Sequence, residues 1–228
     1  MTAGRDAVSR TVAAYDRIAG EYLARWRDRR VVERPLAMLA TLLPAGALVL
    51  DLGCGPGFDG AALRAQGLRV VGADLSWQMV RLGRDHYPGV YLQADMRRLP
   101  LAAGTVDGIW ASASLLHLPR PLLAPVLAEG RRVLAGEGLF YLSLKEGTGE
   151  AWRADACGRE APRFFTYWTA AALDSELRTA GLATVAGWQE EGSRDLWLNR
   201  IVRKMSGSGQ PGSKGGRRPH RTNLREER

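Results

Sequence analysis

Residues 48–57 read Leu-Val-Leu-Asp-Leu-Gly-Cys-Gly-Pro-Gly, and this stretch decides the fold. Its short apolar run predicts a buried parallel strand that ends on Asp51. Glycines at positions 53, 55 and 57 predict a turn into a helix over 59–66, because a backbone without Cβ atoms lets a ligand approach closely. Asp51 would repel a phosphate but accept an ammonium group or a hydroxyl. The pattern therefore indicates a nucleoside ligand with a cationic or amino-acid end.

Two further apolar runs end in acidic residues. Residues 68–72 lead to Asp74, about 20 positions after the glycine turn, where nucleoside-binding folds hold ribose hydroxyls. Residues 91–94 lead to Asp95 and Met96, which suit an adenine amino group and the face of its ring. Ligands of open α/β sheets lie off the carboxyl ends of the strands. The three carboxylates therefore predict one site at that edge.

These motifs, in this order, resemble those of the class I S-adenosylmethionine-dependent methyltransferases. Residues 51–57 resemble the first motif of this family, and Asp74-Leu75-Ser76 with Met79 resembles the second. Asp95-Met96 resembles the third motif, and Val106 to Ala111 resembles the fourth strand. The resemblance extends from Tyr15 to about Arg203. It implies an α/β fold, a Rossmann-like three-layer sandwich. Its seven-stranded sheet would have six parallel strands and one antiparallel strand in a C-terminal hairpin.

The resemblance also implies S-adenosylmethionine as the cofactor. Asp51 would lie near its methionine amino group, Asp74 would bind the ribose and Asp95 the adenine. The residues expected to contact the cofactor are Asp51, Gly53, Cys54, Gly55, Gly57, Asp74, Leu75, Met79, Asp95, Met96 and Ala111. We expect no metal site.

Each acidic residue also has a plain structural interpretation. Asp51 can cap the turn, Asp74 can cap the helix that runs to about Arg84, and Asp95 can be an ordinary loop residue. Cys54 can simply be a small residue that fills the turn. A nicotinamide-dependent oxidoreductase is a distant alternative, because the dinucleotide pattern G-x-G-x-x-G needs glycine where Phe58 stands.

The methyl acceptor should approach over the ends of the fourth and fifth strands, where His117 and Glu146 lie. His117 suits a general base or a group that binds the acceptor, because histidine titrates near neutral pH. A histidine packed behind the site and bonded to backbone remains an open alternative. Glu146 is placed similarly, and an ion pair would explain it equally well. We predict both as catalytic residues.

An aromatic segment over 160–168 is the best indication of acceptor specificity, with Arg163 and Tyr167 as candidate substrate contacts. Four aromatic residues in five positions can shape a pocket for a flat or anionic acceptor, or can simply be core. Tyr15 and Tyr22 share one face of the first helix, which the resemblance places over the cofactor as a lid. An amphipathic structural helix would give the same spacing.

Missing motifs narrow the acceptor to a small molecule with an oxygen, carbon or nitrogen nucleophile. Residues 111–114 read Ala-Ser-Ala-Ser, not the Asn-Pro-Pro-Tyr-like run of enzymes that methylate base amino groups. Only Cys54 and Cys157 occur, and neither is in the Pro-Cys context that cytosine-C5 methylation needs. Two cysteines also provide no disulfide framework, no thiolate metal site and too few thiols for arsenite methylation.

The 228 residues predict lid helices over 1–45, a core domain over 46–204 and a disordered basic tail over 205–228. Residues 203–228 carry eight basic and two acidic side chains, or +6 of the net charge of +8. Such a tail can contact RNA by counterion release, or can be a solvated extension without a partner. A non-catalytic cofactor-binding protein docked through this tail is therefore an alternative function. Without a signal peptide or apolar span, we expect a soluble, cytoplasmic protein.

Overall fold

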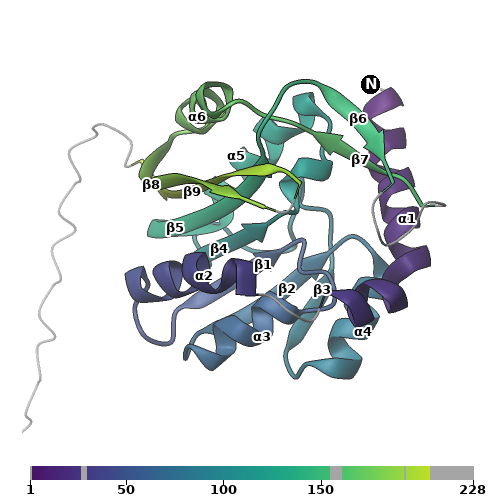
Figure 1. The fold of residues 1–228 in the computed structure, drawn as a ribbon. Coiled ribbons are helices and arrows are strands. Elements are labelled where there is room, and N and C mark those ends of the chain that lie inside the picture. Colours follow the sequence, from purple (N-terminus) through teal and green to yellow (C-terminus); the bar gives the residue numbers. More distant parts are fainter. Residues whose placement is uncertain (1, 27–29, 155–160, 193, 206–228) are drawn as a thin grey trace, which may run out of the picture.

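The computed structural model describes residues 2–26, 30–154, 161–192 and 194–205 (Figure 1). The helices are α1 (Thr2–Arg25), α2 (Arg30–Leu42), α3 (Phe58–Ala65), α4 (Trp77–His86), α5 (Leu123–Val133) and α6 (Ala170–Thr179), with short 3₁₀ helices η1 (Leu115–His117) and η2 (Arg120–Leu122). The strands are β1 (Leu48–Leu52), β2 (Arg69–Asp74), β3 (Val90–Gln93), β4 (Val106–Ser112), β5 (Leu134–Lys145), β6 (Glu150–Arg153), β7 (Arg163–Thr166), β8 (Leu182–Glu191) and β9 (Leu196–Lys204).

Seven of these strands form one sheet in the order β3-β2-β1-β4-β5-β9-β8. The first five pair in parallel, and β9 pairs antiparallel with both β5 and β8. Six strands therefore run in one direction and β9 runs against them. The predicted Rossmann-like fold with its antiparallel hairpin strand is confirmed. The chain order reverses between β1 and β4, which is where open α/β sheets bind ligands.

Helices cover both faces of the sheet and bury a separate apolar core on each (Figure 1). On one face α2 and α3 pack against β1, β2, β4 and β5, with Leu39, Leu63 and Trp110 fully buried. On the other face α5 and α6 pack around Leu127 and Phe140. Segment 1–45 therefore does not form a single lid. Helix α2 belongs to a core layer because its apolar side faces the sheet, and only α1 crosses the edge.

Strands β6 and β7 form a separate two-stranded ribbon beside α1, which was not predicted (Figure 1). Strand β7 is buried along its whole length, and the aromatic run over 164–168 supplies Phe164, Phe165 and Trp168 to the interior. Three of the four aromatic residues of this run are thus core residues.

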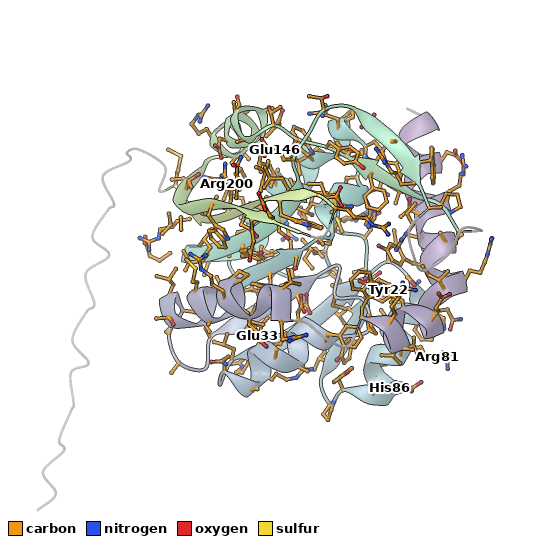
Figure 2. All side chains as sticks on the ribbon, viewed as in Figure 1. Tyr22, Glu33, Arg81, His86, Glu146 and Arg200 are labelled. Atoms are coloured by element: carbon orange, nitrogen blue, oxygen red, sulfur yellow. The ribbon has the colours of Figure 1, made fainter. Side chains whose placement is uncertain are left out.

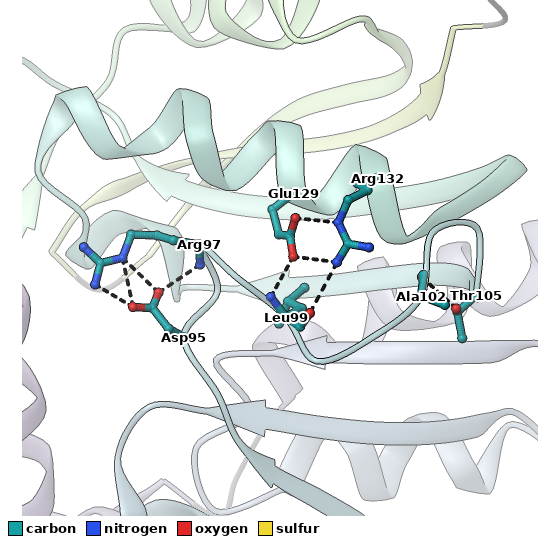
Figure 3. A network of polar contacts seen from close by, with 7 residues as sticks. All are labelled: Asp95, Arg97, Leu99, Ala102, Thr105, Glu129 and Arg132. Atoms are coloured by element: carbon teal, nitrogen blue, oxygen red, sulfur yellow. Dashed lines mark hydrogen bonds and ion pairs between the residues drawn. The ribbon is translucent and has the colours of Figure 1, made fainter.

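A polar network fixes the connection between β3 and β4 to helix α5 (Figure 3). The Glu129 carboxylate accepts hydrogen bonds from the Leu99 amide at 2.6 Å and from the Arg132 guanidinium at 2.7 Å. Because of these bonds the connection that carries Asp95 is anchored at its far end. Burial tends to raise the pKa of Glu129, but the hydrogen bonds from Arg132 outweigh it and hold that pKa below its usual value.

The predicted basic tail lies outside the described residues, apart from Met205. Within the described part of the chain, no helix combines the length and the apolar character that crossing a bilayer requires. The same residues contain no cluster of histidine, cysteine and acidic side chains suited to a metal ion.

Candidate functional site

The glycine turn after β1 adopts a backbone that only glycine takes without strain. Gly53, Gly55 and Gly57 have φ angles of 76°, 51° and 89°, all in the left-handed region. The amides of Gly53 and Cys54 both donate to the Ala73 carbonyl, at 2.7 and 3.1 Å. The turn is thereby fixed to the end of β2, and it confirms the local backbone that the glycine spacing predicted.

A cavity opens at the carboxyl ends of the strands, between the glycine turn and helix α1. It contains twelve of the predicted site residues. These are Tyr15, Tyr22, Asp51, Gly53, Cys54, Gly55, Asp74, Leu75, Met79, Asp95, Met96 and His117. Residues from α1, β1, β2, β4 and η1 and the loop after β3 therefore meet at one place, as the strand-end argument expected.

Two predicted cofactor residues do not line this cavity. Gly57 caps α3, and a Cβ atom there would lie 2.3 Å from the Tyr91 hydroxyl, so this glycine is required by packing. Ala111 is fully buried in the core, because it lies one residue before β4 reaches the cavity. Its successors Ser112, Ala113 and Ser114 line the cavity in its place.

Asp51 and Asp74 are the two carboxylates beside the glycine turn. Asp51 is 3% exposed and lies between Gly72 of β2 and Trp110 of β4 in the sheet register. The Asp74 carboxylate accepts from the amides of Gly55 at 2.9 Å and Ser76 at 2.8 Å. Burial raises the pKa of Asp74, although these hydrogen bonds partly oppose the shift. Asp74 therefore braces the turn and the start of α4; the N-cap itself is Ser76.

Cys54 behaves as a small apolar residue within the turn. Its side chain is buried, and burial together with the Asp51 and Asp74 carboxylates raises the pKa of its thiol well above the usual value. The thiol therefore stays protonated, in agreement with its interpretation as a filler of the turn.

Asp95 already has a cationic partner. The Arg97 guanidinium donates to both carboxylate oxygens, at 2.9 and 3.0 Å from Nε, and the Arg97 amide donates at 2.9 Å (Figure 3). Burial tends to raise the pKa of Asp95, but the hydrogen bonds from Arg97 outweigh it and the pKa lies below its usual value. Asp95 is thus held ionised at the cavity wall.

Tyr15 and His117 form a hydrogen-bonded pair inside the cavity. His117 Nδ1 lies 2.7 Å from the Phe164 carbonyl oxygen, and this nitrogen must carry a proton because a carbonyl only accepts. In the neutral ring Nε2 is then the acceptor, and it lies 2.7 Å from the Tyr15 hydroxyl, which donates to it. The His117 ring therefore lines the cavity and is also bonded to backbone.

Helix α1 is held at both sides of the cavity. Asp16 accepts from the Ser76 hydroxyl at 2.5 Å and the Gln78 amide at 3.1 Å, at the first turn of α4. On the opposite side Thr11 accepts from the Phe164 amide at 3.1 Å. Tyr22 lies over the glycine turn, where a Cβ on Gly55 would be 4.0 Å from its ring. The helix therefore covers the cavity by specific contacts.

Three predicted residues lie outside the cavity lining. The Glu146 carboxylate accepts from Gln189 at 2.9 Å, and Figure 2 shows it near the β8–β9 hairpin, away from Tyr22. The Arg153 guanidinium carbon lies 5.7 Å from the centre of the Tyr167 ring. Arg163 is buried behind Tyr15, with its guanidinium carbon 5.0 Å from the centre of that ring. The structure does not bring Glu146 or Tyr167 to the cavity.

Several lining residues were not anticipated from the sequence. Val8, Thr11 and Val12 continue the Tyr15 face of α1 one and two turns earlier, so helical spacing alone could have identified them. Asp59 also lines the cavity, and it accepts from the Trp110 indole at 2.9 Å, a contact that no local signal announces. Ser114 donates to the Leu52 carbonyl at 2.7 Å and so joins the end of β1 to the loop after β4.

Fold and site together define a nucleoside-binding protein of the Rossmann-like α/β class. The family model described as "Methyltransferase domain" matches residues 49–138, from β1 into β5. Over these residues the chain carries a methyltransferase domain of the class I S-adenosylmethionine-dependent type.

Individual relatives differ in what they methylate. The malonyl-[acyl-carrier protein] O-methyltransferase of Laribacter hongkongensis is 37% identical over 150 residues, which are 59% of this chain and 50% of the relative. The ubiquinone biosynthesis O-methyltransferase of Xanthomonas axonopodis pv. citri is 29% identical over 151 residues, or 60% of this chain and 62% of the relative. The matches thus span about half to three fifths of these relatives' length.

A solved structure resembles almost the whole chain. The 1,6-didemethyltoxoflavin-N1-methyltransferase of Burkholderia thailandensis, with bound 1,6-didemethyltoxoflavin and S-adenosylhomocysteine, superposes with a TM-score of 0.75. The superposition covers 90% of this chain and 92% of the other, at 22% sequence identity. At that identity the likeness is one of fold.

Proposed function

We propose that the protein transfers a methyl group from S-adenosylmethionine to a small-molecule acceptor in the cavity under α1. The observation that carries this proposal is the convergence of the glycine turn with Asp51, Asp74 and Asp95 at one sheet edge. Carboxylates suit the ammonium group and ribose hydroxyls of the cofactor. The left-handed glycines have no Cβ atom, so the cofactor can approach the backbone of the turn closely. Met79 and Met96 add apolar surface for a base.

The cofactor supplies an activated methyl group on a sulfonium sulfur, so the protein's task is alignment and exclusion of water. Helix α1 supports the exclusion of water, because it spans the cavity between α4 and β7. His117 remains the candidate base, because its Nε2 accepts a hydrogen bond from the Tyr15 hydroxyl inside the cavity. Glu146 is no longer a good candidate, because its carboxylate is bonded to Gln189.

The relatives support a small-molecule acceptor without agreeing on one. Their names refer to a malonyl-[acyl-carrier protein], to ubiquinone biosynthesis and to 1,6-didemethyltoxoflavin. No feature of the described residues favours the nicotinamide alternative. The docking alternative depends on residues 206–228 and remains a separate prediction.

Calorimetric titration with S-adenosylmethionine and S-adenosylhomocysteine tests the proposal. We expect binding of both ligands. An Asp51→Asn variant should bind them at least about tenfold more weakly, which corresponds to a loss of about 1.4 kcal/mol in binding free energy. Asp85→Asn is the matched control, because Asp85 is an exposed partner of Arg81 on α4. A folded protein that binds neither ligand would refute the proposed function.

A further inference from the structure

The acceptor half of the cavity has a distinct chemistry from the cofactor half. Its walls are Val8, Val12 and Leu118, and its polar groups are the hydroxyl of Thr11 and the Tyr15–His117 pair. No lysine or arginine is among the described residues that line the cavity. The carboxylates of Asp51, Asp59, Asp74 and Asp95 do line it (Asp95 against Arg97). An acceptor that enters as an anion would meet four carboxylates and no lysine or arginine among these residues.

We infer that the acceptor is an uncharged hydroxyl compound with an apolar body, and that its proton leaves through Tyr15 to His117. This inference rests on the proposed function and specifies the substrate class of the same site.

The hydrogen bonds give the relay a direction. The Phe164 carbonyl fixes the proton of His117 on Nδ1, so Nε2 presents its lone pair to the Tyr15 hydroxyl. Tyr15 can pass its proton to Nε2 while it receives the proton of the acceptor hydroxyl. The acceptor oxygen then forms a bond to the methyl carbon as the carbon–sulfur bond breaks, and the sulfide leaves with the electron pair. The proton remains on the imidazolium, which donates to Phe164 and Tyr15.

Tyr15 and His117 are both packed against neighbouring side chains. The Arg163 guanidinium lies 5.0 Å from the centre of its ring, in a buried position on β7. His117 is in turn packed edge-on against Tyr15 and Phe165, at 5.3 and 4.8 Å between ring centres. Both partners are therefore held in place before an acceptor binds, which is what efficient proton transfer needs. A carboxylate acceptor, already ionised at neutral pH, would have no use for this pair.

A panel of matched aromatic acceptors tests the inference. Each pair has the same ring with either a hydroxyl or a carboxylate, for example phenol and benzoate, and formation of S-adenosylhomocysteine is measured by chromatography. We expect wild-type protein to use the hydroxyl member roughly tenfold faster or more. Tyr15→Phe should slow methylation of phenols by about 100-fold. The same variant should retain its rate with 4-nitrophenol above neutral pH, because that acceptor is already ionised.

The control variant is Tyr87→Phe, which removes a hydroxyl from a ring packed on Phe58 and should leave both rates unchanged. Three results would overturn the inference: preference for carboxylates, equal slowing of phenol and 4-nitrophenol by Tyr15→Phe, or transfer to none of the hydroxyl compounds by protein that binds the cofactor. Methylation of carboxylates alone would refute this acceptor class and leave the proposed function intact. Absence of cofactor binding would refute the function itself.

Discussion

At the scale of single residues, Gly53 is a position where the turn leaves no room for a side chain. Its φ angle is 76°, and a Cβ there would lie 2.3 Å from the Ser114 Cβ. Ser114 cannot easily move, because its hydroxyl is bonded to the Leu52 carbonyl. The site therefore depends on this glycine for space as well as for backbone conformation.

We predict that Gly53→Ala lowers the free energy of unfolding by about 2–4 kcal/mol, from left-handed strain and overpacking together. Gly46→Ala is the matched control, since Gly46 has a φ of 72° and open space around it. It should cost only about 1–2 kcal/mol, from backbone strain alone. Urea denaturation measures both, and equal losses would show that contact with Ser114 is unimportant.

Asp74 should make cofactor affinity depend on pH. An ionised carboxylate accepts stronger hydrogen bonds from ribose hydroxyls than a protonated carboxyl group does, and burial raises the pKa of Asp74. Affinity is therefore fully present above that raised pKa and falls as the pH decreases through it, at a higher pH than for an ordinary aspartate. Calorimetry over a pH series should detect the decline in wild type and in the Asp85→Asn control. The Asp74→Asn variant should bind the cofactor more weakly at every pH and should lack the decline that protonation of Asp74 causes. If its affinity fell with pH as steeply as that of the wild type, the assignment of Asp74 to the ribose would be contradicted.

At the scale of elements, α1 depends on Asp16 for its seat on α4. The Asp16 carboxylate receives one hydroxyl and one amide hydrogen bond at the first turn of that helix. Asp16→Ala should destabilise the protein by about 1–2 kcal/mol and speed dissociation of S-adenosylmethionine, because both bonds are lost.

Asp6→Ala on the same helix is its control. It removes only an exposed ion pair with Arg10 and should cost about 0.5 kcal/mol or less. Thermal unfolding and stopped-flow dissociation separate the two variants. Equal dissociation rates in both would mean that α1 does not restrain the cofactor.

The sequence predicted the parts of the site that local rules determine. The glycines predicted a turn after the first strand, and acidic residues after parallel strands were expected at one edge of the sheet. Asp51, Asp74 and Asp95 do line one cavity. Contacts between distant segments carry no such signal. The pairing of Asp16 with Ser76 joins residues 60 positions apart, and that of Tyr15 with His117 joins residues 102 apart.

Glu146 is a residue for which the strand-end rule failed. Its position after a central strand suggested catalysis, but β5 pairs with β9 on one side, and the Glu146 amide donates to the Leu196 carbonyl of β9. The side chain is consequently directed to Gln189 of β8. The antiparallel pairing of the β8–β9 hairpin with β5 determines where the Glu146 side chain points. A rule derived from parallel strands takes no account of such pairing.

At the scale of the whole molecule, the described residues that line the cavity all lie between Val8 and Leu118. Deletion of residues 206–228 removes six basic and two acidic side chains, so the net charge falls from +8 to +4. We predict unchanged affinity for S-adenosylmethionine and unchanged methyl transfer in the truncated protein. Loss of cofactor affinity or transfer would contradict this prediction. Loss of RNA binding alone, measured by filter binding at low salt, would instead favour the docking role of the tail.

Asp16 and Tyr15 are adjacent residues of α1, yet Asp16 bonds to the first turn of α4 and Tyr15 bonds to His117 in the cavity. We predict that a ligand which strengthens the Asp16 contact with α4 also strengthens the Tyr15–His117 contact, because the two residues are adjacent on one helix. Occupancy of either half must then raise affinity for the other by the same factor, since such coupling is reciprocal. The dissociation constant of each ligand, measured with and without a saturating amount of the other, should accordingly fall by one and the same factor.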